Sequence, residues 1–384
     1  MKKRILACLL VLAMVLTACG QGGETSGEPK ESQAETSATE SSDAGSAGEA
    51  TEAKGVEGKT VAFIPKLTGN AFFESANDGA QKFAEKAGFK VDYMGDSTAS
   101  VSAQVAVINQ AVASGADAIC ISTVDAAGVS DALQEAKNAG LTVCTWDSDG
   151  QVGDRALMVS QGTPQVLAQM LVDMSVAGLK DRGIDPEKDP VKYVWHYSQA
   201  TVTDQNSWQV AGEKLIKEKY PNWTNVQPDN YYSEQDAEKA ITVGEAILDA
   251  HSDIDLIICN DSTALPGQLQ AAENKGLSKK DVTITGFSSP NPIKQYCKND
   301  TIYNWGLWDC GTQGAMGCYV AAYLAAGNNV KVGDKINIPE IGEVEVLPNE
   351  SIAEGAETGE ENNGVVILPE RLVFTKDNMN NYDY

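Results

Sequence analysis

Short apolar runs alternate with longer amphipathic segments along this chain from residue 59 onward. The apolar runs are hydrophobic at nearly every position, which is typical of strands in a parallel sheet that helices cover on both faces. Each helical segment of the first half is followed by a glycine, the residue that most often takes the left-handed conformation just past a helix end. These glycines are Gly88, Gly115 and Gly140. The pattern predicts strands at residues 61–64, 91–93, 118–122 and 141–146, and helices at 75–87, 101–114 and 126–139.

The alternation restarts after residue 160. Strands that alternate with helices in two successive sets predict an α/β protein with two doubly wound parallel-sheet lobes. The part expected to fold, about 325 residues, is also longer than a typical single domain. The second set consists of helices at 165–178, 208–219, 234–250 and 265–274, and strands at 193–197, 226–232, 256–259 and 282–284.

Three segments are expected to cross between the lobes, at residues 156–160, 288–292 and 304–309. Several crossing strands side by side form a multi-strand hinge, which bends without letting the lobes slip apart. We therefore expect residues 59–160 plus 288–305 to form the N-terminal lobe. Residues 161–287 plus 306–384 are expected to form the C-terminal lobe and tail.

The first residues have the pattern of a secretory signal. Three basic residues precede an apolar stretch at 5–16, which is shorter than the roughly 20 residues that a membrane-spanning helix needs. The stretch ends in Leu16-Thr17-Ala18-Cys19, which resembles the lipobox of bacterial lipoproteins, whose cysteine carries the lipid. We expect a signal peptide at residues 1–18, and a lipidated Cys19 that opens a disordered acidic linker over residues 19–58. This predicts a lipid-anchored protein on the extracytoplasmic face of the cell membrane; the alternative is an ordinary signal peptide with a chance cysteine.

The chain is strongly acidic, with 29 Lys and Arg against 54 Asp and Glu and a formal net charge of −25. That charge argues against nucleic acid as a partner, because its binding normally needs a basic surface. None of the eight cysteines lies in a Cys-x-x-Cys spacing, so zinc or dithiol chemistry is not expected. We interpret most of them as buried small hydrophobes. A disulfide stays open, since sequence alone does not choose partners. No metal and no cofactor is expected.

Polar residues follow the strands of both halves at the points where the strands end. In open α/β sheets, ligands bind in the crevice outside the carboxyl ends of the strands. Each such residue alone is explained as well by an exposed loop, but the set together indicates one crevice between the lobes. Phe72, Phe73 and Trp308 are candidates for its apolar walls, with ordinary core packing as the alternative. The polar candidates are Lys66, Asp147, Asp204, Gln205, Asn260 and Ser262.

These residue types suit a small neutral molecule that carries several hydroxyl groups. A carboxylate such as Asp147 or Asp204 accepts from adjacent hydroxyls, and charge-assisted bonds are about twice as strong as neutral ones. Lys66 donates to oxygens and offsets the carboxylate charges. Paired carboxylates also occur in glycosidases, but such an enzyme would not need a lysine beside them. Neither histidine lies where a base is expected, and no nucleophile elbow, His-Glu-x-x-His or phosphate-binding glycine loop is present. The sequence favours binding without catalysis.

At these positions the chain resembles the type I periplasmic-binding-protein family, the solute receptors of ABC importers. Within it, residues 59–384 are most similar to the autoinducer-2-binding proteins of Lsr importers. The motifs that carry the likeness include Phe63-Ile64-Pro65-Lys66-Leu67, Thr145-Trp146-Asp147-Ser148-Asp149, Thr201-Val202-Thr203-Asp204-Gln205-Asn206 and Gly306-Leu307-Trp308-Asp309.

The resemblance implies a monomeric, non-enzymatic receptor that closes on a cyclic tetrahydroxy furanose form of autoinducer-2 and delivers it to an ABC transporter permease. Lys66, Asp147, Asp204 and Gln205 match the family's ligand positions. Two further positions, usually Pro and Ala, are occupied by Asn260 and Ser262, which are expected to act largely through main-chain groups. These two side chains leave open a rhamnose- or ribose-type sugar receptor. A co-receptor that presents the ligand to a membrane sensor kinase is a further alternative.

Overall fold

The computed structural model describes residues 53–357 and 361–384. The predicted signal peptide, Cys19 and most of the predicted linker lie outside these residues. The linker was expected to reach residue 58, but its last residues are packed: Val56 is buried, and the Lys54 backbone N–H donates to Asn328 Oδ1 at 2.7 Å. No helix within the described ranges is long and apolar enough to cross a membrane.

The first lobe is built on a parallel sheet of six strands, in the order β14-β5-β4-β3-β1-β2. The bounds of these strands are β1 Thr60–Ile64, β2 Lys90–Tyr93, β3 Ala118–Ile121, β4 Thr142–Trp146, β5 Leu157–Ser160 and β14 Gly364–Ile367. Its helices are α1 Ala71–Ala87, α2 Val101–Ser114, α3 Ser130–Asn138 and α9 Cys310–Ala325, with the 3-10 turns η1 Val152–Asp154 and η2 Asn349–Ser351. The small hairpin of β12 Lys335–Ile338 and β13 Gly342–Glu345 accompanies them.

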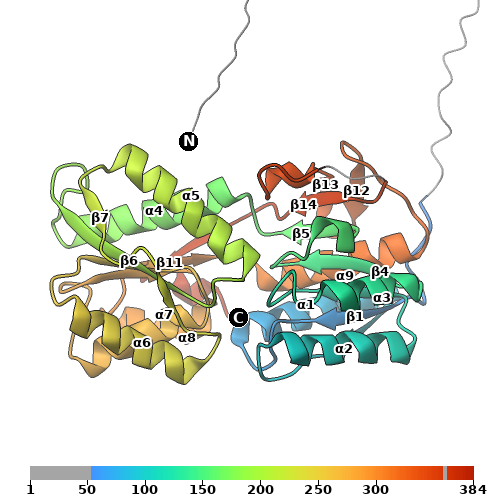
Figure 1. Ribbon diagram of the computed structural model, residues 1–384, viewed down its shortest axis with the longest axis horizontal. Helices are drawn as coiled ribbons and strands as arrows, with labels where there is room; N and C mark the ends of the chain where they lie inside the picture. The colour runs from blue at the N-terminus through green and yellow to red at the C-terminus, as the bar shows by residue number, and fades with distance from the viewer. Residues whose placement is uncertain (1–52, 358–360) are drawn as a thin grey trace, which may run out of the picture. The chain divides into compact units, whose positions relative to one another are not determined.

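Helices cover both faces of this sheet (Figure 1). Alternate residues of β1 point to opposite sides, as they do in any strand. Val61 and Phe63 pack with apolar residues of α1 and α9, whereas Ala62 and Ile64 pack with those of α2 and α3. Burial on both sides explains why the strand runs are apolar throughout. The predicted glycine caps are confirmed at Gly88, with φ 80°, and at Gly115, with φ 76°.

The second lobe is built on a sheet with the parallel order β10-β9-β6-β7, and β8 also pairs with β6. Trp195 of β6 packs toward α5, and His196 beside it donates from Nδ1 to Gln268 Oε1 of α7, so helices lie on both faces. The strands are β6 Val191–Tyr197, β7 Trp223–Asn225, β8 Tyr231–Tyr232, β9 Leu256–Cys259 and β10 Thr283–Gly286. The helices are α4 Pro164–Asp181, α5 Thr203–Lys219, α6 Ala237–Ala250, α7 Ala264–Asn274 and α8 Pro290–Lys298. A further antiparallel pair joins β11 Asn304–Leu307 to β15 Leu372–Thr375, and η3 Met379–Asn381 follows.

The expected division of residues 288–384 between the lobes is wrong for α8, α9 and β14, whereas β15 and η3 lie with the second lobe as expected. Helix α8 contacts α7 of the second lobe, while α9 packs along α1 and against β4, and β14 pairs with β5 of the first sheet. The interface between α1 and α9 depends on glycine: a Cβ atom at Gly314 would lie 2.1 Å from the carbonyl oxygen of Ala76. Because α9 is buried on nearly all sides, it has no single apolar stripe, and the sequence gives no sign of which sheet it covers.

Two element boundaries also differ from the predictions. Helix α5 begins at Thr203 rather than at residue 208, so Asp204 and Gln205 lie in its first turn rather than in a loop. The single strand expected at 226–232 is replaced by two short strands: β7 ends just before this range, and β8 covers only its last two residues. The six described cysteines are buried and unpaired, and burial raises the pKa of the Cys120, Cys144 and Cys259 thiols.

Candidate ligand-binding site

The candidate site lies where strands of both sheets end. In the first sheet β1 lies between β2 and β3, so the strand order changes direction at β1, and such a switch point is where ligands bind in open α/β sheets. The second sheet has the same arrangement, with β6 between β7 and β9. Lys66 follows β1, Asp147 follows β4, and Asn260 follows β9. The chain therefore brings polar groups from both sheets to one place.

These residues surround a small cavity. All nine ligand-binding candidates from the sequence line it, together with residues of the second lobe that were not among them. That they bind a ligand remains a prediction. The lining residues are Lys66, Phe72, Phe73, Asp147, Asp204, Gln205, Trp208, Gln235, Asn260, Asp261, Ser262, Phe287, Leu307 and Trp308.

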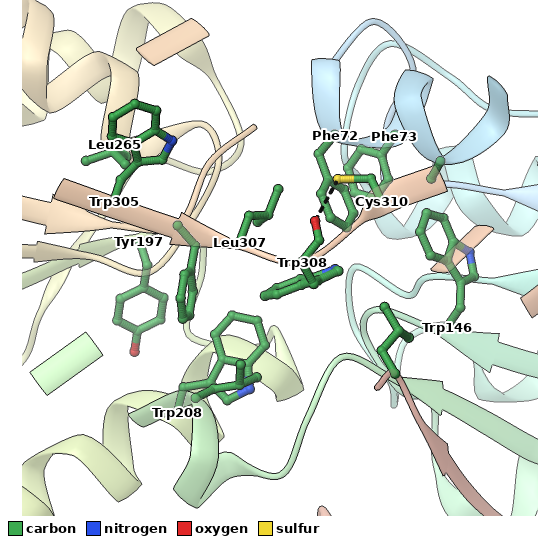
Figure 2. Close-up of a cluster of buried hydrophobic side chains, with 14 of the residues drawn as sticks. Phe72, Phe73, Trp146, Tyr197, Trp208, Leu265, Trp305, Leu307, Trp308 and Cys310 are labelled. Carbon is green, nitrogen blue, oxygen red and sulfur yellow. Dashed lines mark hydrogen bonds between the residues drawn. The ribbon is translucent and has the colours of Figure 1, made fainter. Parts of the chain in front are cut away.

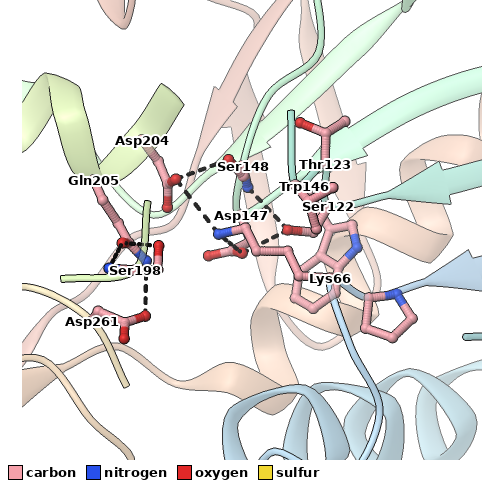
Figure 3. Close-up of polar contacts among 12 residues, drawn as sticks. Lys66, Ser122, Thr123, Trp146, Asp147, Ser148, Ser198, Asp204, Gln205 and Asp261 are labelled. Atoms are coloured by element: carbon pink, nitrogen blue, oxygen red, sulfur yellow. Dashed lines mark hydrogen bonds and ion pairs between the residues drawn. The ribbon is translucent and has the colours of Figure 1, made fainter. Parts of the chain in front are cut away.

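The cavity lining contains a buried cluster of one ammonium and two carboxylates (Figure 3). Lys66 Nζ is 3.1 Å from Asp147 Oδ2 and 3.5 Å from Asp204 Oδ1. Ser122 Oγ donates to the same Asp147 oxygen at 2.7 Å, and Ser148 Oγ donates to Asp204 Oδ1 at 2.8 Å. Because Asp204 belongs to the second lobe and the other four residues to the first, the cluster joins the two lobes.

The cluster changes the protonation of its members. Burial alone would lower the pKa of Lys66, but the carboxylates of Asp147 and Asp204 outweigh it and raise that pKa, so the ammonium stays charged. Burial raises the pKa of Asp204 to about 6; Lys66 opposes the shift and Asp147 adds to it. Asp204 is therefore mostly ionised at neutral pH and becomes protonated in mild acid.

Asp147 is held in an unusual backbone conformation. Its φ is 57°, in the left-handed region that a non-glycine residue seldom adopts, although Asp and Asn tolerate it better than most. Gln161 Nε2 donates to the Asp147 carbonyl at 3.1 Å, and Gln313 Nε2 in turn donates to Gln161 Oε1 at 2.9 Å. Strained residues of this kind cluster at functional sites, where the surrounding structure holds them in place.

Gln205 and Asn260 form a second polar group on the opposite wall. Gln205 Oε1 accepts from the backbone N–H and the hydroxyl of Ser198, at 3.1 and 2.5 Å, and its Nε2 donates to Asp261 Oδ2 at 3.0 Å. Asn260 Nδ2 donates to the Gln205 carbonyl at 2.9 Å. The Asn260 side chain thus contacts a residue of the cavity lining, whereas Asn260 was expected to act largely through its main chain.

Two buried acceptors that line the cavity make no hydrogen bond within the described residues: Asp204 Oδ2 and Asn260 Oδ1. An unpaired buried polar atom costs free energy, and native structures satisfy nearly all of them. Both atoms are acceptors, so a bound molecule that satisfies them must supply hydroxyl or N–H donors. The arrangement fits a compact polyol.

Aromatic rings form the apolar side of the cavity (Figure 2). The Trp308 ring lies edge-on to Phe72, Trp208 and Phe287, with centroids 5.6 to 5.9 Å apart. Its indole N–H donates to Gln313 Oε1 at 2.6 Å, so the ring presents carbon to the cavity. Trp146 lies outside the lining and packs against Phe63 and Phe72.

No group of three or more His, Cys, Asp or Glu suited to a metal ion occurs in the described part of the chain. His196 is buried in β6, and this burial lowers its pKa to about 4, so the side chain is neutral at physiological pH. It does not line the cavity.

Sequence reasoning missed several lining residues. Asp261, Gln235 and Phe287 follow β9, β8 and β10, so the strand-end rule that found the others applies to them as well. Asp261 comes directly after Asn260 but was not among the predicted ligand residues. Gln235 has φ 60° and lies in the turn before α6, a placement that depends on tertiary structure.

A model of the family described as "Periplasmic binding protein domain" matches residues 61–329 of the chain. The chain belongs to the periplasmic binding proteins. Members of this family are solute receptors that serve ABC transporters outside the cytoplasm. The two-lobed α/β architecture described above is the type I fold of these proteins.

Among solved periplasmic binding proteins, LsrB from Clostridium saccharobutylicum in complex with AI-2 is 69% identical, with a TM-score of 0.84; the match covers 85% of this chain and 100% of that one. A solute-binding protein from Clostridium phytofermentas with bound L-rhamnose is 24% identical, with a TM-score of 0.71 and coverage of 85% and 98%, which shows the shared fold. A D-ribose/D-allose-binding protein of Pseudomonas aeruginosa is 23% identical over 85% of this chain and 93% of that protein.

Proposed function

We propose that this protein is the autoinducer-2 receptor of an ABC importer, and that the cavity between its sheets holds the ligand. The main support for this proposal is the group of charged and amide side chains that comes from both lobes. It consists of Lys66, Asp147, Asp204 and Gln205. The high identity to an LsrB protein that was solved with AI-2 supports the same ligand here.

The mechanism follows from the placement of the contacts. Lys66 and Asp147 belong to the first lobe and Asp204 and Gln205 to the second, so a ligand that bonds to both sets favours the state in which the lobes are together. Lys66 donates to ligand oxygens, while the two carboxylates accept from ligand hydroxyls. The aromatic wall excludes water, which strengthens these polar contacts. Nothing in this scheme requires bond cleavage, and we propose that the protein is not an enzyme and acts as a monomer.

A pentose or deoxyhexose receptor is the second candidate. Asn260 supports it, because its Oδ1 atom adds an unpaired acceptor to the cavity wall. Ser262 adds a hydroxyl to the same lining. More hydrogen-bonding groups favour a ligand with more hydroxyls. Releasing the ligand from purified protein by heating and identifying it by mass spectrometry separates the candidates: autoinducer-2 supports the first, and a sugar alone contradicts it.

Binding of autoinducer-2 is expected to weaken as the pH falls through about 6. The ionised form of Asp204, whose pKa is about 6, accepts the ligand hydroxyls, so binding favours loss of the proton. The affinity for autoinducer-2 should therefore be nearly constant above about pH 7 and fall by up to about tenfold for each pH unit below 6. Calorimetric Kd values across this range test it. Asp204→Asn should flatten the profile, and an unchanged wild-type Kd at about pH 5 would contradict it.

We further propose that Cys19 carries a lipid that anchors the receptor on the extracytoplasmic face of the cell membrane. The support is the basic and apolar stretch before it and the Leu16-Thr17-Ala18-Cys19 motif. Metabolic labelling with a clickable fatty acid is expected to label wild-type protein. The Cys19→Ala variant should carry no label and appear in the soluble fraction, whereas a labelled Cys19→Ala variant would refute the anchor.

A further inference from the structure

Asp261 is a buried carboxyl group of the cavity wall, with 3% of its surface exposed. Its two oxygens have separate partners. Oδ1 accepts from the backbone N–H groups of Thr263, at 3.1 Å, and Ala264, at 2.7 Å, where α7 begins. Oδ2 accepts from Gln205 Nε2 at 3.0 Å. One oxygen therefore holds the start of a helix, and the other faces a residue of the ligand set (Figure 3).

The partners of Gln205 allow only one orientation of its amide. Oε1 already accepts two hydrogen bonds from Ser198, which uses both of its lone pairs. Nε2 gives one hydrogen to Asp261, and its second hydrogen is the only group of this amide that has no partner in the described residues. Rotating the amide by half a turn would place Nε2 against the two donors of Ser198 and Oε1 against the Asp261 carboxylate.

We propose that Asp261 is a specificity-determining residue: it fixes the Gln205 amide so that Gln205 offers only an N–H donor to the ligand. The inference rests on the proposed function of the cavity. A glutamine that is free to rotate accepts either a donor or an acceptor, whereas this one requires a hydroxyl or ring oxygen opposite it. A ligand that lacks an oxygen there leaves the N–H unpaired and is rejected.

The Asp261→Asn variant separates the effect of Asp261 on the Gln205 amide from its hydrogen bonds to the start of α7. Asparagine caps helices as well as aspartate does, and its Oδ1 can still accept from Thr263 and Ala264. Its Nδ2 replaces the oxygen that Gln205 bonds to, so two N–H donors meet. Autoinducer-2 binding, measured by calorimetry, is expected to weaken by about 10- to 100-fold, as for one buried polar group left unpaired. The ligand-free melting temperature should fall as well.

A second substitution separates ligand recognition from stability. Adding Gln205→Glu to Asp261→Asn gives a carboxylate that accepts both from the new amide and from Ser198. The hydrogen-bond network of the protein is then complete, so the ligand-free melting temperature is expected to recover. The N–H donor toward the ligand is still missing, so the affinity for autoinducer-2 should stay low. Recovered stability without recovered affinity would show that the ligand requires the N–H donor, and recovery of both would contradict the inference.

Asp125→Asn is the matched control. Asp125 Oδ1 accepts from the backbone N–H groups of Ala127 and Gly128, at 3.0 and 2.8 Å, in the same local pattern as Asp261, but it does not line the cavity. Its affinity should equal that of the wild type. If wild-type protein does not bind autoinducer-2, the proposed function fails and the inference falls with it. If the wild type binds but Asp261→Asn binds equally well, or the double variant regains affinity, the inference alone is overturned.

Discussion

Replacing Lys66 by methionine is expected to weaken autoinducer-2 binding by about 100-fold or more, because it leaves two buried carboxylates without their cation. Lys66 is 3% exposed, and its ammonium lies within 3.5 Å of both Asp147 and Asp204. Removing one partner of a buried ion pair costs about 3–5 kcal/mol. No other Lys or Arg among the described residues lines the cavity, so no nearby cation replaces it. Methionine keeps most of the side-chain volume, which limits the effect to the charge.

Lys59→Met serves as the control for this variant. Lys59 directly precedes β1, the strand that Lys66 follows, and pairs with Asp117 at 3.0 Å, far from the cavity lining. Calorimetry should give the same Kd for Lys59→Met as for wild-type protein. A Lys66→Met variant that also binds with the wild-type Kd would mean that the ion cluster does not belong to the binding site.

Asp147→Asn and Asp204→Asn are each expected to weaken binding by about 10- to 100-fold, because hydrogen bonds to a charged group contribute about 1.5–3 kcal/mol. Asparagine has nearly the same shape as aspartate and also tolerates the left-handed conformation of residue 147. The substitution at 204 removes a carboxyl whose Oδ2 has no partner among the described residues, and Lys66 keeps Asp147. The ligand-free melting temperature of Asp204→Asn should therefore change little, while its Kd rises.

The Asp154→Asn variant tests whether replacing any buried aspartate by asparagine weakens autoinducer-2 binding. Asp154 is also buried with an unpaired Oδ2, and its Oδ1 accepts from Gln134 at 2.7 Å, but it lies outside the cavity. Its Kd should match the wild type. Normal binding by both cavity variants would show that the ligand lies elsewhere.

Periodicity predicted the core of the fold well because each strand and helix carries its own pattern. The helix at 101–114 and the strand at 256–259 have the predicted ends. The local residue pattern does not show whether a segment late in the chain packs against the first sheet or the second. The assignment of α8, α9 and β14 to the lobes was wrong for this reason, since it depends on long-range packing such as that of Gly314 against Ala76.

The candidate site could be predicted from the sequence only for residues that directly follow a predicted strand. Lys66 and Asp147 follow strands, and the topology places such ends together. What the sequence does not contain is the pairing between walls. The contact of Gln205 with Asp261, for example, spans 56 residues and two different elements. The left-handed turn that carries Gln235 is likewise invisible in the residue pattern.

The most direct test of the account is calorimetric titration of purified wild-type protein, freed of bound ligand, with autoinducer-2 and with D-ribose, L-rhamnose and D-arabinose. We expect saturable binding of autoinducer-2 at one site per chain, with each sugar at least about 100-fold weaker, since a site built on directed hydrogen bonds discriminates strongly. Tight binding of one of these sugars without any response to autoinducer-2 would contradict it.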